Sequence, residues 1–175
     1  DVDEEHPYYT AIMELAERGI ILGKGGGLFG PNDPVTRQQF AKMIVKSLGI
    51  VVTGSEVCPF TDVQTQVGDD PFYPSKYVAI CAREEITKGY NATTFGAADF
   101  IKHQQLITMV VRAAILSDPP AGFMVTFTPG QFSLQEHYLN AKKAAYAGLL
   151  NELLGIGPSY DFLGASTRGE CAHIL

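Results

Sequence analysis

The sequence contains no tryptophan and only three cysteines among its 175 residues. It also lacks any apolar run close to the roughly 18 residues that a membrane-spanning helix needs. Positive charge is scarce, because 13 Lys and Arg residues oppose 19 Asp and Glu residues and leave a net charge of -6. A chain without a global basic field is a poor match for nucleic acid. We therefore expect neither a nucleic-acid partner nor insertion into a membrane.

The cysteines and histidines do not form a recognisable reactive or metal-binding set. Cys58, Cys81 and Cys171 show no metal-ligand spacing, and no Cys-x-x-Cys pair occurs. A disulfide between Cys58 and Cys81 would leave Cys171 unpaired, whereas burial as small apolar side chains suits Cys81 and Cys171. Cys171 and His173 lie two residues apart, a spacing that places them on different faces of a helix. We expect no catalytic residue, no metal and no cofactor.

An internal repeat is the strongest signal in the sequence. Residues 9–12 (Tyr-Thr-Ala-Ile) return at 77–80 (Tyr-Val-Ala-Ile), and each copy opens a segment of periodic apolar residues. The copies also share a turn region in which an aromatic residue, Phe29 or Phe95, precedes a glycine. A third, looser copy spans residues 144–172, and such self-similarity indicates a repeat architecture. We therefore predict three units that fold as one body: residues 1–50, 51–116 and 117–175.

Each unit predicts a helix, a glycine-rich loop and a second helix, so the expected fold class is all-α. The first helix of unit one is expected at about residues 8–18, and that of unit three at about 135–154. The second helices are expected to run through residues 41–48 and 107–116. An apolar stripe is formed in unit one by Phe40, Ile44 and Leu48. A helix pair cannot bury its apolar face alone, so the units should pack on one another.

The start of the second helix recurs as a polar motif. Thr36 with Gln39, and Thr167 with Glu170, fit the capping-box pattern in which the two side chains satisfy each other's backbone amides. Helix initiation is therefore the expected main role of these four residues.

Capping does not explain the arginines that follow these threonines. A cation in the first helical turn opposes the helix dipole, yet Arg37 and Arg168 occupy equivalent positions there. One interpretation is an anionic partner, bound by free helix amides together with an arginine fork. The other is that both arginines pair with surface carboxylates, and spacing alone leaves the choice open. The second unit has Lys102 and His103 instead, which keeps positive character but loses the threonine hydroxyl and the guanidinium.

These motifs together resemble the S-layer homology (SLH) family. The resemblance is carried by residues 11–12, 19–23, 29–32 and 35–41, with a Thr-Arg-Gln-Gln stretch where the family has Thr-Arg-Ala-Glu. Phe60-Thr61-Asp62-Val63 is similar to the lead-in that precedes such repeats. The resemblance covers nearly the whole chain, as three tandem repeats.

The resemblance implies a pseudo-threefold α-helical bundle with grooves between repeats. It also implies a non-catalytic anchor at the bacterial cell surface, outside the cell, that binds an anionic cell-wall polysaccharide, often a pyruvylated secondary cell-wall polymer. Because an ordinary histidine is mostly neutral near pH 7, weaker or pH-dependent binding is expected at the groove of His103. The expected ligand-binding residues are Arg37, Arg168, His103, Lys102, Thr36, Thr167, Gln39 and Glu170, with Tyr8 as an aromatic face.

The alternative function is a helical-repeat module for protein–protein interaction. Such a module should present exposed apolar or aromatic anchors along one helical face, whereas the recurring candidates here are cationic helix starts. If these cations bind a glycan, replacing Arg37 and Arg168 by alanine should abolish binding with little change in thermal stability.

Overall fold

The computed structural model describes residues 1–151, 153 and 155–175, and this part of the chain is helical. It contains no strand within these ranges, only isolated backbone bridges, so the predicted all-α class is confirmed. The helices are α1 (Tyr9–Glu17), α2 (Arg37–Ser47), α3 (Ser75–Arg83), α4 (His103–Ala113), α5 (Gln135–Tyr146) and α6 (Arg168–Ile174), with a short 3-10 turn η1 (Pro129–Gln131) before α5.

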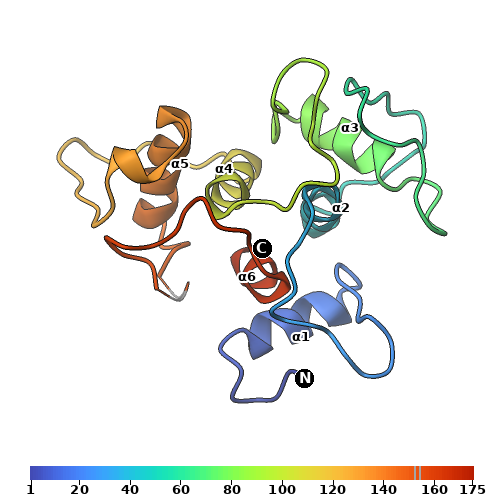
Figure 1. The fold of residues 1–175 in the computed structure, drawn as a ribbon, viewed down its shortest axis with the longest axis horizontal. Helices are drawn as coiled ribbons and strands as arrows, with labels where there is room; N and C mark the ends of the chain where they lie inside the picture. The colour runs from blue at the N-terminus through green and yellow to red at the C-terminus, as the bar shows by residue number, and fades with distance from the viewer. Residues whose placement is uncertain (152, 154) are drawn as a thin grey trace.

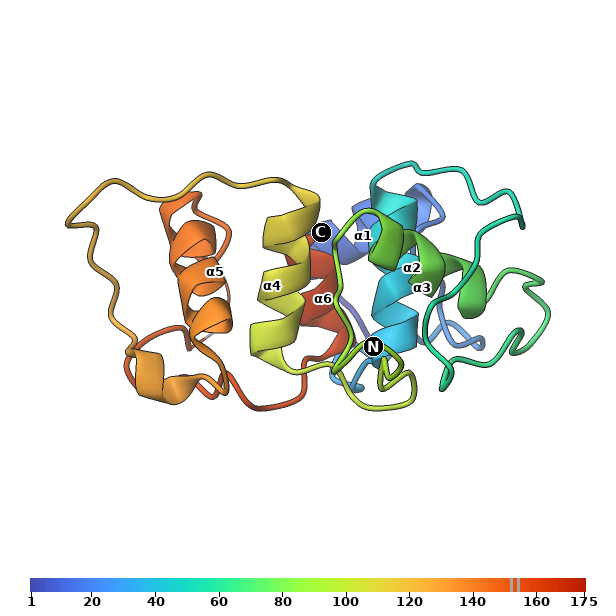
Figure 2. The same cartoon turned by 90° about the horizontal axis from the view of Figure 1, so that it is seen from above.

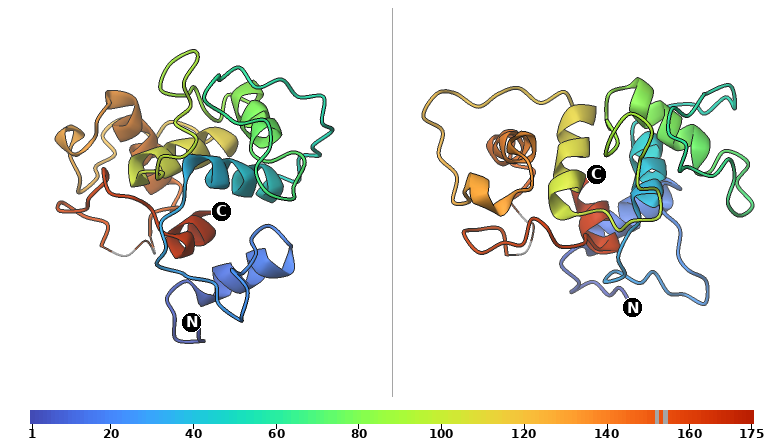
Figure 3. Two further views of the ribbon diagram at one scale, coloured as in Figure 1. Left: turned by 45° about the vertical axis from the view of Figure 1, so that its right-hand side comes forward. Right: turned by 45° about the horizontal axis from the view of Figure 1, so that its top comes forward.

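The helices form an inner and an outer set. Helices α2, α4 and α6 lie near the centre, and α1, α3 and α5 lie around them (Figure 1). Helix α2 packs against α3, α4 against α5, and α6 against α1. Each outer helix therefore packs on the inner helix of a different predicted unit. The views in Figures 2 and 3 show the same three pairs from other directions.

A ring of three backbone hydrogen bonds joins the segments that lead into the inner helices. The amide of Val35 donates to the carbonyl of Ser166 at 3.1 Å, the amide of Ser166 to Ile101 at 2.8 Å, and the amide of Ile101 to Val35 at 2.8 Å. Each segment thus donates to one neighbour and accepts from the other. This ring fixes the starts of all three inner helices relative to one another.

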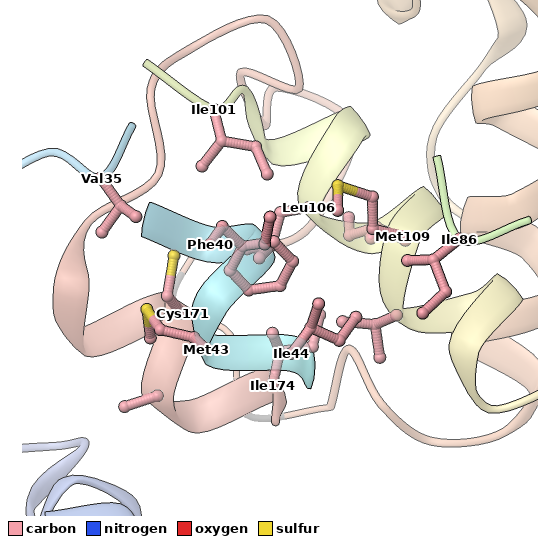
Figure 4. Packing of buried hydrophobic residues seen from close by; sticks show 14 of the residues in the cluster. Val35, Phe40, Met43, Ile44, Ile86, Ile101, Leu106, Met109, Cys171 and Ile174 are labelled. Carbon is pink, nitrogen blue, oxygen red and sulfur yellow. The ribbon is translucent and has the colours of Figure 1, made fainter. Parts of the chain in front are cut away.

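The core lies between the inner helices. Phe40, Leu106 and Cys171 each occupy the fourth position of an inner helix, are at most 1% exposed, and contribute to one hydrophobic cluster that spans all six helices. Figure 4 shows them converging with Ile44 and Ile174. Since the apolar faces are buried between helices of different units, this core cannot form within one unit.

Left-handed residues end the helices at equivalent points. Gly19 and Gly49 end the first and second helices of unit one with φ values of 66°, as a C-cap glycine does. In unit two the same places hold Glu85 (φ 56°) and Ile115 (φ 51°). The turns are therefore conserved in geometry between the units although glycine is not.

Three details of the helix predictions are wrong. Helix α5 ends at Tyr146 rather than near residue 154, because Gly148 takes a φ of 82° and reverses the chain; Leu154 itself lies outside the described residues. The side chain of Leu48 is 43% exposed, so it does not belong to the buried stripe. Finally, α1 and α3 begin at Tyr9 and Ser75, so the match of residues 9–12 to 77–80 is two positions out of register.

The three cysteines are free thiols, so the disulfide alternative is not realised. Cys81 and Cys171 are fully buried, as predicted, and burial raises the pKa of both thiols. Within the described ranges, no three His, Cys, Asp or Glu side chains are placed to hold a metal ion. No helix there has the length and apolar character needed to cross a bilayer.

Candidate functional site

The predicted capping boxes are present at both threonines. The amide of Gln39 donates to Thr36 Oγ1 at 3.4 Å, and the amide of Thr36 donates to Gln39 Oε1 at 2.8 Å. Thr167 and Glu170 repeat the arrangement at 3.3 and 2.8 Å. At α4 the amide of Lys102 donates to the Gln105 side chain at 3.1 Å. Helix initiation therefore accounts for the local roles of these residues.

The first amides of the inner helices are already bonded, which removes part of the predicted anion site. The amides of Arg37 and Gln38 donate to the carbonyls of Asp99 and Ala97 at 2.9 and 3.1 Å. The corresponding bonds at α4 and α6 run from His103 to Gly164, Gln104 to Phe162, Arg168 to Asp33 and Gly169 to Pro31. The expectation that free helix amides receive an anion is wrong, because a loop of the next unit occupies them.

Arg37 is a buried side chain that links two units. It is only 3% exposed, and its Nε donates to the carbonyl of Phe95 at 2.8 Å. Its guanidinium lies 4.6 Å from the ring centroids of both Tyr90 and Phe95, within cation–π range. Burial lowers the pKa of Arg37, opposed by nearby groups that include Asp99. Arg37 is thus neither a surface cation nor part of a surface ion pair.

Arg168 repeats this arrangement at a more open position. Its Nε donates to the carbonyl of Phe29 at 2.9 Å, and its second terminal nitrogen donates to Leu22 at 2.7 Å. The guanidinium lies 4.3 Å from the Phe29 ring centroid. Arg168 is half-buried, so its outer face keeps contact with solvent.

His103 is paired within the protein rather than open to a ligand. One ring nitrogen lies 3.1 Å from Glu170 Oε2, and the other lies 2.7 Å from the carbonyl of Asp161. Its ring centroid also lies 4.9 Å from that of Tyr160, with the two rings tilted by 47°. Burial alone would lower the pKa of His103, but the bonds to Glu170 and Asp161 outweigh it and raise the pKa above 6.5. For Glu170, burial acts upward, and the bond to His103 holds its pKa below 4.5.

The His103–Glu170 pair predicts a pH-dependent stability. Because the pKa of His103 is raised in the folded state, the pair contributes fully to stability below pH 6.5. This contribution is lost as the pH rises through the pKa of His103 in the folded protein. Because the pKa of Glu170 is lowered in the folded state, its contribution to stability is present above pH 4.5 and is lost as the pH falls through the folded pKa. We expect the unfolding free energy of wild type to exceed that of a His103→Gln variant by about 1 kcal/mol near pH 5.5. Near pH 8.5 the difference should be smaller. Urea unfolding at both pH values measures this, and a constant difference would contradict it.

Tyr8 does not present an open aromatic face. It is 6% exposed, and its ring lies 5.0 Å from that of His173. A Cβ atom added at Gly169 would come within 2.8 Å of the Tyr8 ring. Tyr8 therefore fills the space between α1 and α6.

A cationic cavity lies between α2, α4, α5 and the loop after α3, and we call it the first groove. Its volume is about 310 Å³. Among the described residues, its charged lining consists of the buried Arg37, the three cations Lys88, Lys102 and Arg112, and one carboxylate, Glu136. The uncharged lining includes Gln105, Thr108 and Ser133, which offer hydrogen bonds. His137 also lines it and bonds Thr108 Oγ1 at 2.7 Å, and burial lowers the pKa of His137 below 6.5.

A second groove occupies the equivalent place between α6, α2 and the loop after α1. Its volume is about 230 Å³. Its Gln39, Met43 and Lys46 on α2 match Gln105, Met109 and Arg112 on α4. Arg168 and Lys42 add positive charge, and its apolar wall consists of Ile20, Ile21, Leu22 and Met43, with Tyr73 beside it. This groove combines cations with a continuous apolar wall, whereas the apolar lining of the first groove includes only Met109 and Leu134 among the described residues.

The structure brings some predicted residues together and leaves others apart. Arg37 and Lys102, predicted for separate grooves, line the same cavity, and Gln39 joins Arg168 in the second. Sequence analysis missed Lys88, Arg112, Glu136 and His137 in the first groove and Lys42 and Lys46 in the second. A signal existed for one pair, because Lys46 and Arg112 recur in the last turns of α2 and α4. A cation in the last turn of a helix is already explained by its favourable interaction with the helix dipole. The sequence therefore gives no separate reason to assign these two residues to a binding site.

Helix–loop–helix segments that recur along the chain and pack on one another define the class of helical-repeat proteins. A family model described as the S-layer homology domain matches residues 1–41 and 59–107, and the chain belongs to this family. The third predicted unit lies outside the matched ranges.

Characterised relatives are similar over part or all of the chain. A surface layer protein of Brevibacillus choshinensis is 29% identical over 102 residues, which is 58% of this chain and 9% of the relative. An S-layer protein of Bacillus licheniformis is 25% identical over 175 residues, the whole chain and 19% of the relative. A cellulosome-anchoring protein of Acetivibrio thermocellus is 28% identical over 132 residues, 73% of the chain and 28% of the relative. The chain thus spans less than a third of each, and these comparisons place it at the bacterial cell surface or cell wall.

Proposed function

We propose that this chain is a non-catalytic anchoring module that binds an anionic cell-wall polysaccharide, a secondary cell-wall polymer, through grooves between its units. The observation that carries the proposal is the first groove, whose described lining holds four cations and one carboxylate on a protein whose net charge is -6. An acidic surface that concentrates cations in one cavity suits an anionic ligand. The anchoring and surface-layer relatives are consistent with that role.

The proposal assigns binding to two of the three inter-unit positions. In the first groove, Lys102 and Lys88 contact the ligand, while Arg37 shapes the floor. In the second, Arg168 and Gln39 contact it. At the third position the His103 ring bonds the Glu170 carboxylate, so that position binds weakly or not at all. The three units are then related by a pseudo-threefold arrangement whose grooves have diverged.

The polymer's acidic group is a carboxylate, and a pyruvyl acetal suits the second groove best. Such a group presents a methyl beside its carboxylate. Ile21 and Leu22 offer the apolar contact, and Arg168 and Lys46 offer the charge. Thr36 and Thr167 serve the site indirectly, by fixing the helix starts that carry the arginines.

A sacculus pull-down tests this function. Sacculi from a bacterium whose surface proteins belong to this family are prepared intact and after chemical removal of the attached polymer. The protein should sediment with the intact sacculi and remain in solution with the stripped ones, because only the polymer supplies the anionic ligand. Sedimentation that survives removal of the polymer would refute the proposal and favour a protein or peptidoglycan partner.

A further inference from the structure

A carboxylate of the chain itself occupies the cationic centre of the first groove. Glu136 Oε1 lies 2.7 Å from a terminal nitrogen of Arg112 and 3.0 Å from Lys88 Nζ. One carboxylate oxygen therefore accepts hydrogen bonds from both cations. The bond from Arg112 has the largest effect on the pKa of Glu136 and lowers it. Burial raises this pKa and the bond from Lys88 lowers it further, so that the pKa lies below 4.5 and Glu136 is ionised near neutral pH.

Helix initiation explains the presence of an acid here but not its contacts. Glu136 lies in the first turn of α5, where a negative charge complements the helix dipole. That benefit is the same for any orientation of the carboxylate. The observed carboxylate instead reaches across to Lys88, on the loop after α3, and to Arg112, on α4.

The second groove supplies an internal comparison. Tyr73 is the counterpart of Glu136, because each lies the same number of residues before the left-handed residue that follows its outer helix, Glu85 or Gly148. Tyr73 lines the second groove as Glu136 lines the first. The second groove thus has an uncharged side chain at this place. Its Lys46, the counterpart of Arg112, bonds only a backbone carbonyl among the contacts described, that of Gly19 at 2.6 Å. Lys42 in that groove does have a carboxylate partner, Asp70 at 2.6 Å, but this partner is not part of the groove lining.

We propose that Glu136 is an internal competitor that sets the affinity of the first groove. Its carboxylate occupies the place of the ligand's acidic group, and the ligand binds by displacing it from Lys88 and Arg112. This inference rests on the proposed function and refines it. Glu136 is 45% exposed on its side chain, so it can swing into solvent without opening the core. The first groove therefore binds an acidic ligand more weakly than it would without Glu136.

The test compares Glu136→Gln with Glu84→Gln. Both variants remove one negative charge that is paired with an arginine, but Glu84 pairs with Arg83 outside the first groove. The probe is the soluble polymer released from the sacculi, titrated into each protein by calorimetry. We expect the dissociation constant of Glu136→Gln to fall about fivefold below that of wild type, since a salt-bridged competitor has been removed. Glu84→Gln should change it by less than about twofold.

The outcomes separate this inference from the proposed function. If wild type binds no released polymer, the proposed function fails and the inference fails with it. If wild type binds and Glu136→Gln binds equally or more weakly, the function stands and Glu136 is a ligand contact or an orienting residue instead. An equal gain in both variants would show that net charge alone is responsible. Thermal unfolding of each variant confirms that the fold is retained before the titration.

Discussion

An Arg37→Ala variant is expected to lose about 3 kcal/mol of unfolding free energy, because three interactions of a buried side chain disappear together. The bond from Nε to the carbonyl of Phe95 is lost, and so are the stacking contacts with Tyr90 and Phe95. Alanine also leaves that buried carbonyl without its donor. A loss of this size is a large share of the 5–15 kcal/mol that typically stabilises a domain. Urea unfolding followed by circular dichroism measures it.

Arg18→Ala is the matched control for this experiment. Arg18 is exposed and pairs only with Glu14 on its own helix among the contacts described, so its removal should cost less than about 0.5 kcal/mol. The sequence-based expectation was that Arg37 could be removed with little effect on stability, and its burial overturns the reason for that expectation. Equal unfolding midpoints for wild type and Arg37→Ala would restore it, because Arg37 would then have no measurable role in stability.

Replacing Lys88 and Lys102 together by glutamine is expected to weaken binding of the released polymer by about tenfold or more, since two groove cations are lost. Both side chains are exposed, so the fold should be unaffected. The loss should shrink as the salt concentration rises, because mobile ions screen exposed charges. Calorimetric titration at low and high salt measures both effects.

The control for this pair is Arg18→Gln with Arg83→Gln. These two arginines are about as exposed as Lys88, and among the contacts of the described residues each pairs with a glutamate of its own turn or helix. The control removes the same net charge from outside both grooves and should change the dissociation constant by less than about twofold. A similar loss in both double variants would mean that the polymer responds to overall charge rather than to the first groove.

The repeat and its helix starts could be predicted because their causes are local. Thr36 and Thr167 cap helices through residues three positions away, and Gly19 and Gly49 end helices through their own backbone geometry. The sequence predicts too long a helix for α5, because leucines follow Gly148 and extend the apolar pattern. The left-handed φ of Gly148 outweighs the helical propensity of the leucines that follow.

The composition of the site could be predicted only in part, because it depends on contacts between units. Arg37 and Lys102 were identified from their helix starts, but nothing in the local sequence shows that they line one cavity with Lys88 and Arg112. The internal pairing of His103 with Glu170 also joins residues far apart in the chain. Side chains of this kind are found from the packing of the units and not from the spacing within one.

The contact between α1 and α6 has a consequence for how the chain folds. Helix α1 is synthesised before the other helices described here, whereas α6, the inner helix that covers its apolar face, is the last of them. The hydrogen bond from Val35 to Ser166 likewise joins an early segment to one that is synthesised much later. Contacts between such distant residues slow folding, since the intervening chain must be ordered first. The apolar side of α1 is therefore left without its native partner until α6 is made, a period in which α1 depends on other surfaces for cover.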